Sequence, residues 1–239
     1  MCGIVGMVGR GSVNQEIYDA LLLLQHRGQD STGIATAEPS GVFHITKARG
    51  QVREAFRTRD MRSLLGTIGL GHVRYATKGT ASSEEEAQPF YVNAPYGIVL
   101  VHNGNLTNTR ELTDELFHKD RRHLNTSSDT ELLVNVLAGE LQATVSGLDL
   151  EPDEIFEAVS RVHARVEGSY AAIALIAGHG LLAFRDPFGI RPLILGTRKA
   201  PDGSYEWVVS SESLVLENGE FEVVRDVMPG EAVFIDLDG

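Results

Sequence analysis

The chain opens with an apolar run that is followed by a segment of helical periodicity. Residues 2–8 are all apolar or glycine and stop at the glycine-rich residues 9–11, which predicts a buried strand. Apolar side chains then recur every three or four positions between residues 17 and 24. This spacing predicts a helix, with Asn14 as its amino-terminal cap and Gly28 as its end.

Two short apolar segments come next, and turn residues separate them. Residues 33–37 and 42–47 flank the turn formers at positions 39–41, which predicts a β-hairpin. A short helical stretch is then expected to end at Leu65. The apolar residues from Ile68 to Arg74 predict a further strand.

The middle of the chain is predicted to be mainly helical. A polar loop from Thr77 to Glu86 precedes it, and such a loop is a candidate to move over a site. The continuous apolar run Ile98–His102 predicts a buried strand that ends at the turn-forming residues 103–105. Three helices are expected to follow, over residues 107–118, 128–141 and 152–166.

The last third of the chain changes to β periodicity. Turns that contain glycine or proline separate five predicted strands, over residues 170–177, 181–185, 193–197, 206–210 and 231–236. Helices placed between runs of hairpin-linked strands favour an α+β fold with antiparallel sheets covered by helices. No repeat or interdomain linker is evident, so we expect a single domain.

The final residues carry a turn signal without a second strand. The apolar residues 232–235 lead into Asp238-Gly239, a dipeptide that favours a hairpin turn. We therefore expect this chain to be the leading part of a longer polypeptide.

Composition narrows the class of protein. The chain has 239 residues, of which 42% are hydrophobic and 23% charged, as in ordinary globular proteins. A formal charge of −12 argues against a nucleic-acid partner, because phosphate binding needs a concentrated basic face. No signal sequence or membrane-length apolar run is evident, and no metal-ligand spacing. One cysteine excludes a disulfide within the chain and suits a reducing compartment, so we expect a cytoplasmic protein without membrane contact.

Two charge clusters are interpreted as solvated surface. Residues Lys119–Arg122 resemble an exposed helix end, and Glu84–Glu86 resemble an exposed loop. Neither is expected to take part in chemistry.

The single cysteine, Cys2, is the strongest candidate for chemistry. Removal of Met1 would leave one residue with both a thiol and a free α-amine, which unites a nucleophile with a candidate base. An α-amine titrates near pH 8, so part of it can accept a proton at neutral pH. The alternative is a small buried residue that begins a strand, which is how most unpaired cysteines behave.

A cysteine that attacks a carboxamide needs hydrogen-bond donors for the oxyanion. Asn103 and Gly104 follow the predicted buried strand and offer a side-chain N–H and a backbone N–H. The alternative is a plain turn, because Asn-Gly is common in short hairpins.

Two charged residues suit the recognition of an amino acid, and a third suits the activation of the thiol. Arg74 ends its predicted strand and can bind an α-carboxylate in bidentate fashion. Asp129 begins a predicted helix and can bind an α-ammonium group, but its spacing alone favours helix capping. Arg27 is expected to pack against the amino-terminal strand and favour the thiolate, or else to cap the first helix.

These motifs, taken in order, resemble a known family along essentially the whole chain. Three segments are similar to amino-terminal-nucleophile (Ntn) glutamine amidotransferases in general: residues 2–6, 72–75 and 103–106. Four further segments resemble the glutaminase domain of the glutamine phosphoribosylpyrophosphate amidotransferases, which open purine synthesis: residues 26–31, 86–91, 121–126 and 185–192. A glucosamine-6-phosphate synthase or an asparagine synthetase would usually differ at residues 26–31.

The resemblance implies a function and a set of roles. It implies hydrolysis of glutamine to glutamate and ammonia through a thioester on Cys2, with Asn103 and Gly104 as the oxyanion hole. Arg74 and Asp129 would bind glutamine, helped by Thr77. The implied fold is a four-layer αββα sandwich of the Ntn-hydrolase type over residues 2–239.

The resemblance also implies a partner domain. In the full-length enzyme, a carboxy-terminal phosphoribosyltransferase domain, absent from this segment, would use Mg²⁺ and pass the ammonia to phosphoribosylpyrophosphate, giving 5-phosphoribosylamine. A homo-oligomer is expected for that enzyme, and no cofactor for this segment.

The chain departs from some relatives, and alternatives stay open. Only Met1 precedes Cys2, so we expect simple methionine removal rather than cleavage of a propeptide, and no iron–sulfur ligand here. Lys78 stands where related synthases often have histidine, and it is assigned no role. The alternatives are the glutaminase domain of a glucosamine-6-phosphate or asparagine synthase, and a non-catalytic glutamine-sensing module.

Overall fold

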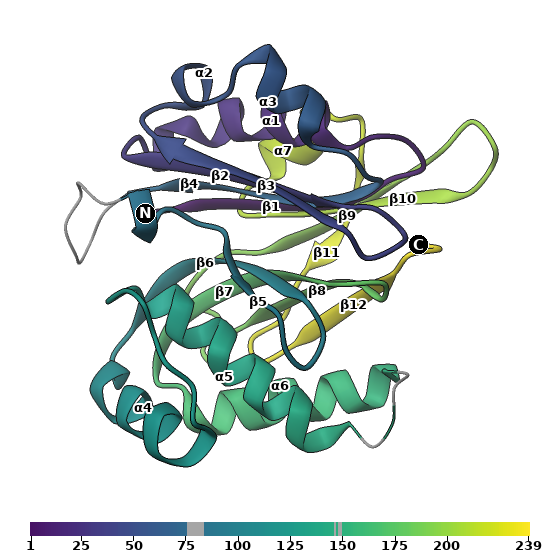
Figure 1. Cartoon of the computed structure of the whole chain (residues 1–239). Helices are drawn as coiled ribbons and strands as arrows, with labels where there is room; N and C mark the ends of the chain where they lie inside the picture. The colour runs from purple at the N-terminus through teal and green to yellow at the C-terminus, as the bar shows by residue number, and fades with distance from the viewer. Residues whose placement is uncertain (76–83, 146, 148–149) are drawn as a thin grey trace.

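The computed structural model describes residues 1–75, 84–145, 147 and 150–239, and its largest element is an antiparallel sheet of seven strands. The strand that begins with Gly3 lies at its centre (Figure 1). In spatial order the strands are β11 (Glu222–Asp226), β9 (Ile194–Lys199), β10 (Tyr205–Ser210), β1 (Gly3–Val8), β4 (Ile68–Arg74), β2 (Ser31–Ala37) and β3 (Phe43–Arg49).

A second antiparallel sheet of five strands packs face to face with the first. Its centre is the hairpin-linked pair β7 and β8, and the long strand β6 lies beside β7. In spatial order the strands are β12 (Ala232–Asp236), β8 (Gly180–Arg185), β7 (Gly168–Ile176), β6 (Ile98–Leu106) and β5 (Phe90–Val92).

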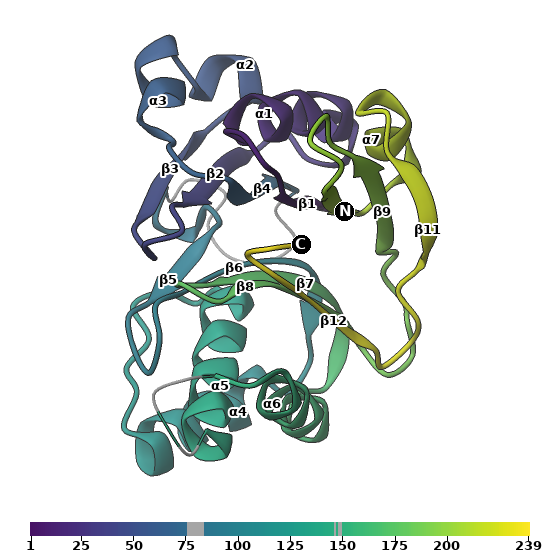
Figure 2. The same ribbon diagram turned by 90° about the vertical axis from the view of Figure 1, so that its right-hand side faces the viewer.

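Helices cover the outer face of each sheet, so the molecule has four layers (Figures 1 and 2). The seven-stranded sheet is covered by α1 (Asn14–Leu23), the 3-10 turn η1 (Leu24–Arg27), α2 (Val52–Ala55), α3 (Thr58–Ser63) and α7 (Ser213–Asn218). The five-stranded sheet is covered by α4 (Thr109–Glu115), the π-helical turn η3 (Leu116–Asp120), α5 (Asp129–Thr144) and α6 (Pro152–Arg165). The predicted αββα sandwich is confirmed.

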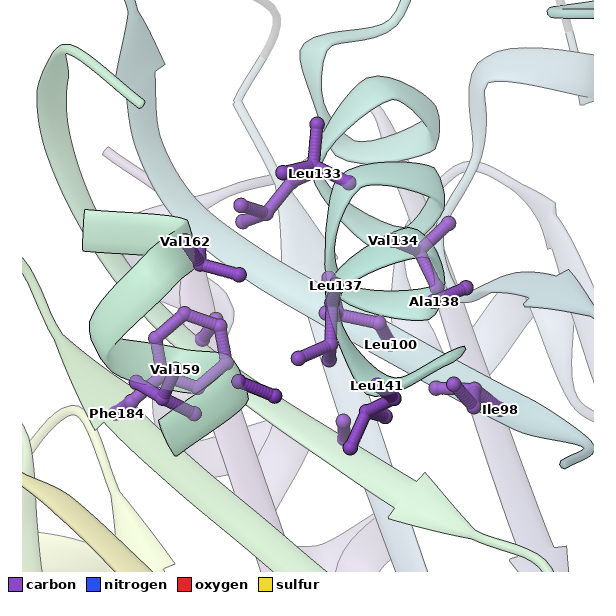
Figure 3. Close-up of a cluster of buried hydrophobic side chains, with 14 of the residues drawn as sticks. Ile98, Leu100, Leu133, Val134, Leu137, Ala138, Leu141, Val159, Val162 and Phe184 are labelled. Atoms are coloured by element: carbon purple, nitrogen blue, oxygen red, sulfur yellow. The ribbon is translucent and has the colours of Figure 1, made fainter. Parts of the chain in front are cut away.

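The outer layer under the five-stranded sheet is the largest apolar core. Leu133, Leu137 and Leu141 lie along one side of α5 and pack with Val159 and Val162 of α6 against the sheet (Figure 3). All five are at most 2% exposed. These positions repeat at helical spacing, which explains why periodicity alone predicted both helices.

Strand alternation decides which side chains face the space between the sheets. In β1, Ile4 and Val8 belong to the intersheet core, so Cys2 projects to the same side. In β4, Ile68 and Leu70 belong to that core, which directs Arg74 there as well.

The same alternation applies to β6. Val99 and Val101 lie in the intersheet core, and Asn103 continues their side of the strand. Ile98 and Leu100 face α5 instead. One end of the intersheet layer therefore collects the side chains of three strands from both sheets.

Some predicted boundaries were wrong. Asn14 is the first residue of α1 rather than its cap, since Val13 holds the cap position. Among the strands and α-helices that the structure describes, three short elements were not predicted: β5, α7 and β11. They contain three to six residues each, too few for periodicity to distinguish them from loops. Among the helices that the structure describes, none combines the length and apolar character that a membrane span requires.

Candidate active site

A cavity opens at the end of the intersheet layer where the first strand begins. It brings together four of the residues predicted from sequence: Cys2, Arg74, Gly104 and Asp129. The other residues that line it are Tyr75, Gln88, His102, Asn105, Leu106, Thr109, Ser127 and Ser128. Its wall thus combines a nucleophile, a cation and an anion.

Cys2 lies directly before the start of β1 and is partly exposed; it lines the cavity. Its Sγ atom is 3.8 Å from the carbonyl oxygen of Tyr75. Burial raises the pKa of the Cys2 thiol above its ordinary value, and the charge of Asp129 adds to this, while the Tyr75 contact, the chain amino group and Arg74 oppose it. The thiol is therefore protonated near pH 7, and an attack by sulfur needs a base.

Arg74 is buried and forms an ion pair with Glu86, a residue that the sequence analysis placed on the solvated surface. Its Nη2 atom donates to Oε2 of Glu86 at 2.8 Å, and both side chains are at most 10% exposed. Oε1 of Glu86 accepts a hydrogen bond from Ser127 at 3.0 Å. The prediction that Glu84–Glu86 is solvated surface was wrong for Glu86, because its carboxylate pairs with the buried guanidinium of Arg74 and accepts from Ser127.

Asp129 lies in the wall of the cavity and is not the helix cap. Ser128 caps α5, with its hydroxyl accepting from Thr130 N at 3.3 Å. Asp129 accepts from the backbone N–H of Leu106 at 3.2 Å. Its other oxygen is 3.7 Å from Nδ1 of His102, but burial lowers the pKa of His102, so this neighbour is a neutral ring near pH 7.

Asn103 and Gly104 lie inside β6, not in a turn after it. The strand continues to Leu106, and Asn103 and Gly104 pair with Ala171 and Tyr170 of β7. The prediction of a strand ending at residues 103–105 was wrong, because the partner strand supplies backbone pairing that the local sequence does not reveal.

The surroundings of these two residues suit hydrogen-bond donation. Asn103 is 1% exposed, and among the described residues its side-chain nitrogen has no hydrogen-bond partner. A buried donor without a partner is costly, and such a donor is able to bind a ligand oxygen. Asn103 itself is not among the residues that line the cavity, whereas Gly104 is. A Cβ atom at Gly104 would lie 1.9 Å from the carbonyl oxygen of Ser169, so only glycine fits.

Arg27 packs against the start of β1, as predicted. Its Nε atom donates to the carbonyl oxygen of Cys2 at 2.9 Å, which anchors the backbone of the cysteine. Its Nη1 atom is paired with Glu212 at 2.5 Å. Because Glu212 compensates this charge, the contact with the backbone is the clearer contribution of Arg27 to the site.

Two residues considered in the sequence, Thr77 and Lys78, lie outside the described part of the chain. Among the residues within it, no group of three or more histidine, cysteine, aspartate or glutamate side chains could hold a metal ion. Sequence reasoning missed Glu86, Gln88 and Ser127 as parts of the site. Glu86 and Gln88 are polar residues that only the fold shows to be buried beside the site, whereas Ser127 is exposed and reaches the site through its hydrogen bond to Glu86.

The architecture defines the class of this protein. Two antiparallel sheets covered by helices, with a cysteine at the mouth of a central strand, make up the sandwich of the Ntn hydrolases. The sequence profile of the glutamine amidotransferase domain matches residues 72–218. The chain belongs to this glutamine amidotransferase family.

Several proteins of known sequence or structure are similar to this chain. The amidophosphoribosyltransferase of Pasteurella multocida is 54% identical over 239 residues, and that of Escherichia coli is 52% identical. Each match covers 100% of this chain and 47% of the relative, so the chain spans about half the length of these curated relatives. The structure of glutamine phosphoribosylpyrophosphate amidotransferase from B. subtilis, complexed with ADP and GMP, aligns with a TM-score of 0.81 at 30% identity, covering 100% of this chain and 48% of that one.

Proposed function

We propose that this chain is the glutaminase part of an amidophosphoribosyltransferase. The observation that carries the proposal is the shared cavity of Cys2, Arg74, Gly104 and Asp129, in a chain about half identical to curated amidophosphoribosyltransferases. A cation and an anion there suit the two charged groups of an α-amino acid, and the thiol suits attack on its side-chain amide.

The proposed reaction begins with the loss of Met1, which frees the α-amine of Cys2. The thiol attacks the side-chain carboxamide carbon of glutamine, and its proton passes to the α-amine. Asn103 Nδ2 and the Gly104 N–H stabilise the oxyanion. The α-amine then returns the proton to the departing ammonia, and a water molecule hydrolyses the thioester to glutamate.

Arg74 and Asp129 serve as the amino-acid receptor in this proposal. Arg74 binds the α-carboxylate and Asp129 the α-ammonium group. Thr77 assists at the carboxylate, by analogy with the family alone. Arg27 supports the site by holding the Cys2 carbonyl oxygen in place.

The proposal extends to the rest of the enzyme. The relatives are about twice as long as this chain, which supports a phosphoribosyltransferase domain as partner. That domain would use Mg²⁺ and react ammonia with phosphoribosylpyrophosphate to give 5-phosphoribosylamine in purine biosynthesis. We expect no cofactor for the glutaminase step, a homo-oligomer for the complete enzyme, and a cytoplasmic location, where a single reduced thiol is stable.

A covalent-labelling experiment tests the glutaminase proposal. The purified protein is treated with 6-diazo-5-oxo-norleucine, a glutamine analogue that alkylates the attacking group, and its intact mass and peptide map are measured. We expect one adduct, on Cys2 of protein from which Met1 has been removed. The labelled protein should no longer release glutamate and ammonia from glutamine.

The Cys2→Ser variant is the matched control and should take no adduct and release no ammonia above background. An adduct on another residue, or undiminished turnover by Cys2→Ser, would refute the proposal. Calorimetric binding of glutamine by Met1-free protein that does not hydrolyse it would indicate a sensing module instead.

A further inference from the structure

The segment that leads from the 3-10 turn η2 (Glu84–Glu86) into β5 contacts residues that line the cavity. Two of its side chains, Glu86 and Gln88, are 6% and 5% exposed, and each forms hydrogen bonds to a different part of the site. Neither is assigned a role in the proposed reaction, on which the following inference rests.

Glu86 connects the two elements that receive the amino-acid end of glutamine. One oxygen accepts from Arg74 Nη2 at 2.8 Å, and the other accepts from the Ser127 hydroxyl at 3.0 Å. Ser127 lies two residues before Asp129 and also lines the cavity. A guanidinium is planar, so the contact at Nη2 restrains the orientation of the whole group. The carboxylate thus restrains Arg74 relative to the segment that carries Asp129.

Gln88 makes a similar connection to the strand β6. Its Oε1 atom accepts from the His102 N–H at 2.7 Å, and its Nε2 atom donates to the His102 carbonyl oxygen at 3.2 Å. This pair of bonds clamps the backbone of β6 immediately before Asn103. The side-chain amide therefore restrains the strand on which the oxyanion donors lie.

The segment between these side chains is itself held firmly. Lys47 Nζ donates to the carbonyl oxygens of Ala87 and Pro89, at 2.7 and 3.3 Å. Across from it, a Cβ atom on Gly33 would lie 2.0 Å from the carbonyl oxygen of Gln88, so the backbone of β2 fits closely against the segment. A segment anchored in this way can position other groups, because its own movement would break several contacts.

We propose that Glu86 and Gln88 are positioning residues that act on different groups of the site. Glu86 orients Arg74 and the Ser127–Asp129 segment toward the charged groups of glutamine. Gln88 sets the position of Asn103 and Gly104 relative to the Cys2 sulfur. Loss of the Glu86 contacts should weaken substrate binding, whereas loss of the Gln88 contacts should slow the chemical step.

The first test compares Glu86→Ala with Glu86→Gln. Alanine removes both contacts and should raise the KM for glutamine about tenfold or more, with kcat within about threefold of wild type. Glutamine in this position should restore KM to within about threefold. Its amide oxygen can accept from Arg74, and its nitrogen can donate to the Ser127 hydroxyl, which reverses that bond.

The rescue by Glu86→Gln separates positioning from charge compensation. If Glu86 served only to neutralise Arg74, the Gln variant would behave like Ala, and the proposal would be overturned. An unchanged KM in Glu86→Ala would also overturn it. The adjacent exposed residue supplies the control, and Glu85→Ala should keep wild-type kinetics.

Two alkylating reagents test the effect of Glu86 on substrate binding without measuring turnover. Inactivation by diazo-oxo-norleucine needs the amino-acid receptor and should require about tenfold more reagent in Glu86→Ala. Alkylation by iodoacetamide needs only the Cys2 thiol and should be unchanged. If Glu86→Ala does not fold, as judged by circular dichroism, Ser127→Ala removes one of the two contacts and should still raise KM several-fold. An unchanged KM in that variant would refute the role of Glu86.

The second test replaces Gln88 with methionine, which has similar length and no hydrogen bonds to offer. Gln88→Met should lower kcat about tenfold with KM within about threefold of wild type, the reverse of the Glu86→Ala pattern. Gln15→Met, at an exposed position of α1, is the control. Equal effects on both parameters, or no effect, would refute the division of roles. If wild-type protein neither hydrolyses glutamine nor forms the Cys2 adduct, the proposed function itself fails, and this inference with it.

Discussion

Three residues of this site have unusual surroundings: a donor without a partner in the described part of the chain, a position without room for a side chain, and a thiol with a raised pKa. Asn103 is buried, yet its amide nitrogen has no partner among the residues that the structure describes. Gly104 has no side chain because the carbonyl oxygen of Ser169 occupies the place of a Cβ atom. The Cys2 thiol has a raised pKa and so depends on a base for its reactivity. The features of Asn103 and Cys2 bear on chemistry, whereas glycine at position 104 is also required for packing against β7.

Replacement of Asn103 by alanine tests this interpretation at the residue scale. The variant should lower kcat for glutamine hydrolysis by about a hundredfold or more, because a preorganised donor to the oxyanion is lost. It should leave the free energy of unfolding nearly unchanged, since the amide nitrogen makes no hydrogen bond to any residue that the structure describes. Steady-state kinetics and urea denaturation measure the two quantities. Wild-type kcat in a folded variant would contradict the oxyanion role.

At the scale of elements, strand alternation and helix periodicity place side chains for chemistry on one side of an element and side chains for stability on the other. In β6, Val99, Val101 and Asn103 face the other sheet, while Ile98 and Leu100 face α5. One side of the strand thus leads to the site, and the other side anchors it. The helices α5 and α6 contribute mainly to that anchoring (Figure 3).

A truncation in this layer should affect stability before it affects chemistry. Leu137 of α5 is fully buried, and Leu137→Ala should lower the free energy of unfolding by about 2–5 kcal/mol through lost burial and a cavity. The control Ser160→Ala, at an exposed position of α6, should change it by less than about 0.5 kcal/mol. Urea denaturation at pH 7 measures both. A Leu137→Ala effect as small as the control would show that the layer relaxes around the lost side chain.

At the scale of the whole molecule, the intersheet layer contains a titratable group next to the site. His72 of β4 is fully buried, and burial lowers its pKa from 6.5 to about 3, with the charges of His102 and Arg74 adding to the effect. Between these two values the unfolded chain binds a proton that the folded chain does not. The stability of the whole sandwich therefore falls as the pH falls below 6.5.

This dependence can be measured. Lowering the pH from 7 to 5 should cost about 2 kcal/mol of unfolding free energy through His72 alone. His72→Phe should abolish that share of the dependence, whatever its effect on absolute stability. Urea denaturation of both proteins at pH 7 and pH 5 provides the comparison. Identical pH dependence of the two proteins would show that His72 does not titrate as described.

Much of the fold follows from periodicity in the sequence. The strand Ile68–Arg74 has the predicted bounds, and the hairpin of β2 and β3 and the helix α6 agree with prediction to within two residues. Long periodic segments are predictable because each buries one face, whatever its neighbour. The end of β6 was not predictable, because Asn103 and Gly104 continue as strand only through pairing with β7.

The sequence by itself determined which chemistry is available: one thiol after Met1, an Asn-Gly pair behind an apolar strand, and an arginine at the end of another strand. Residue types and local spacing set these features, so no partner in space is needed to see them. Only the tertiary structure decided that Glu86 is buried against Arg74 and that Gln88 clamps the backbone of His102. Burial and long-range hydrogen bonds depend on which segments meet, and packing of the two sheets brings these segments together.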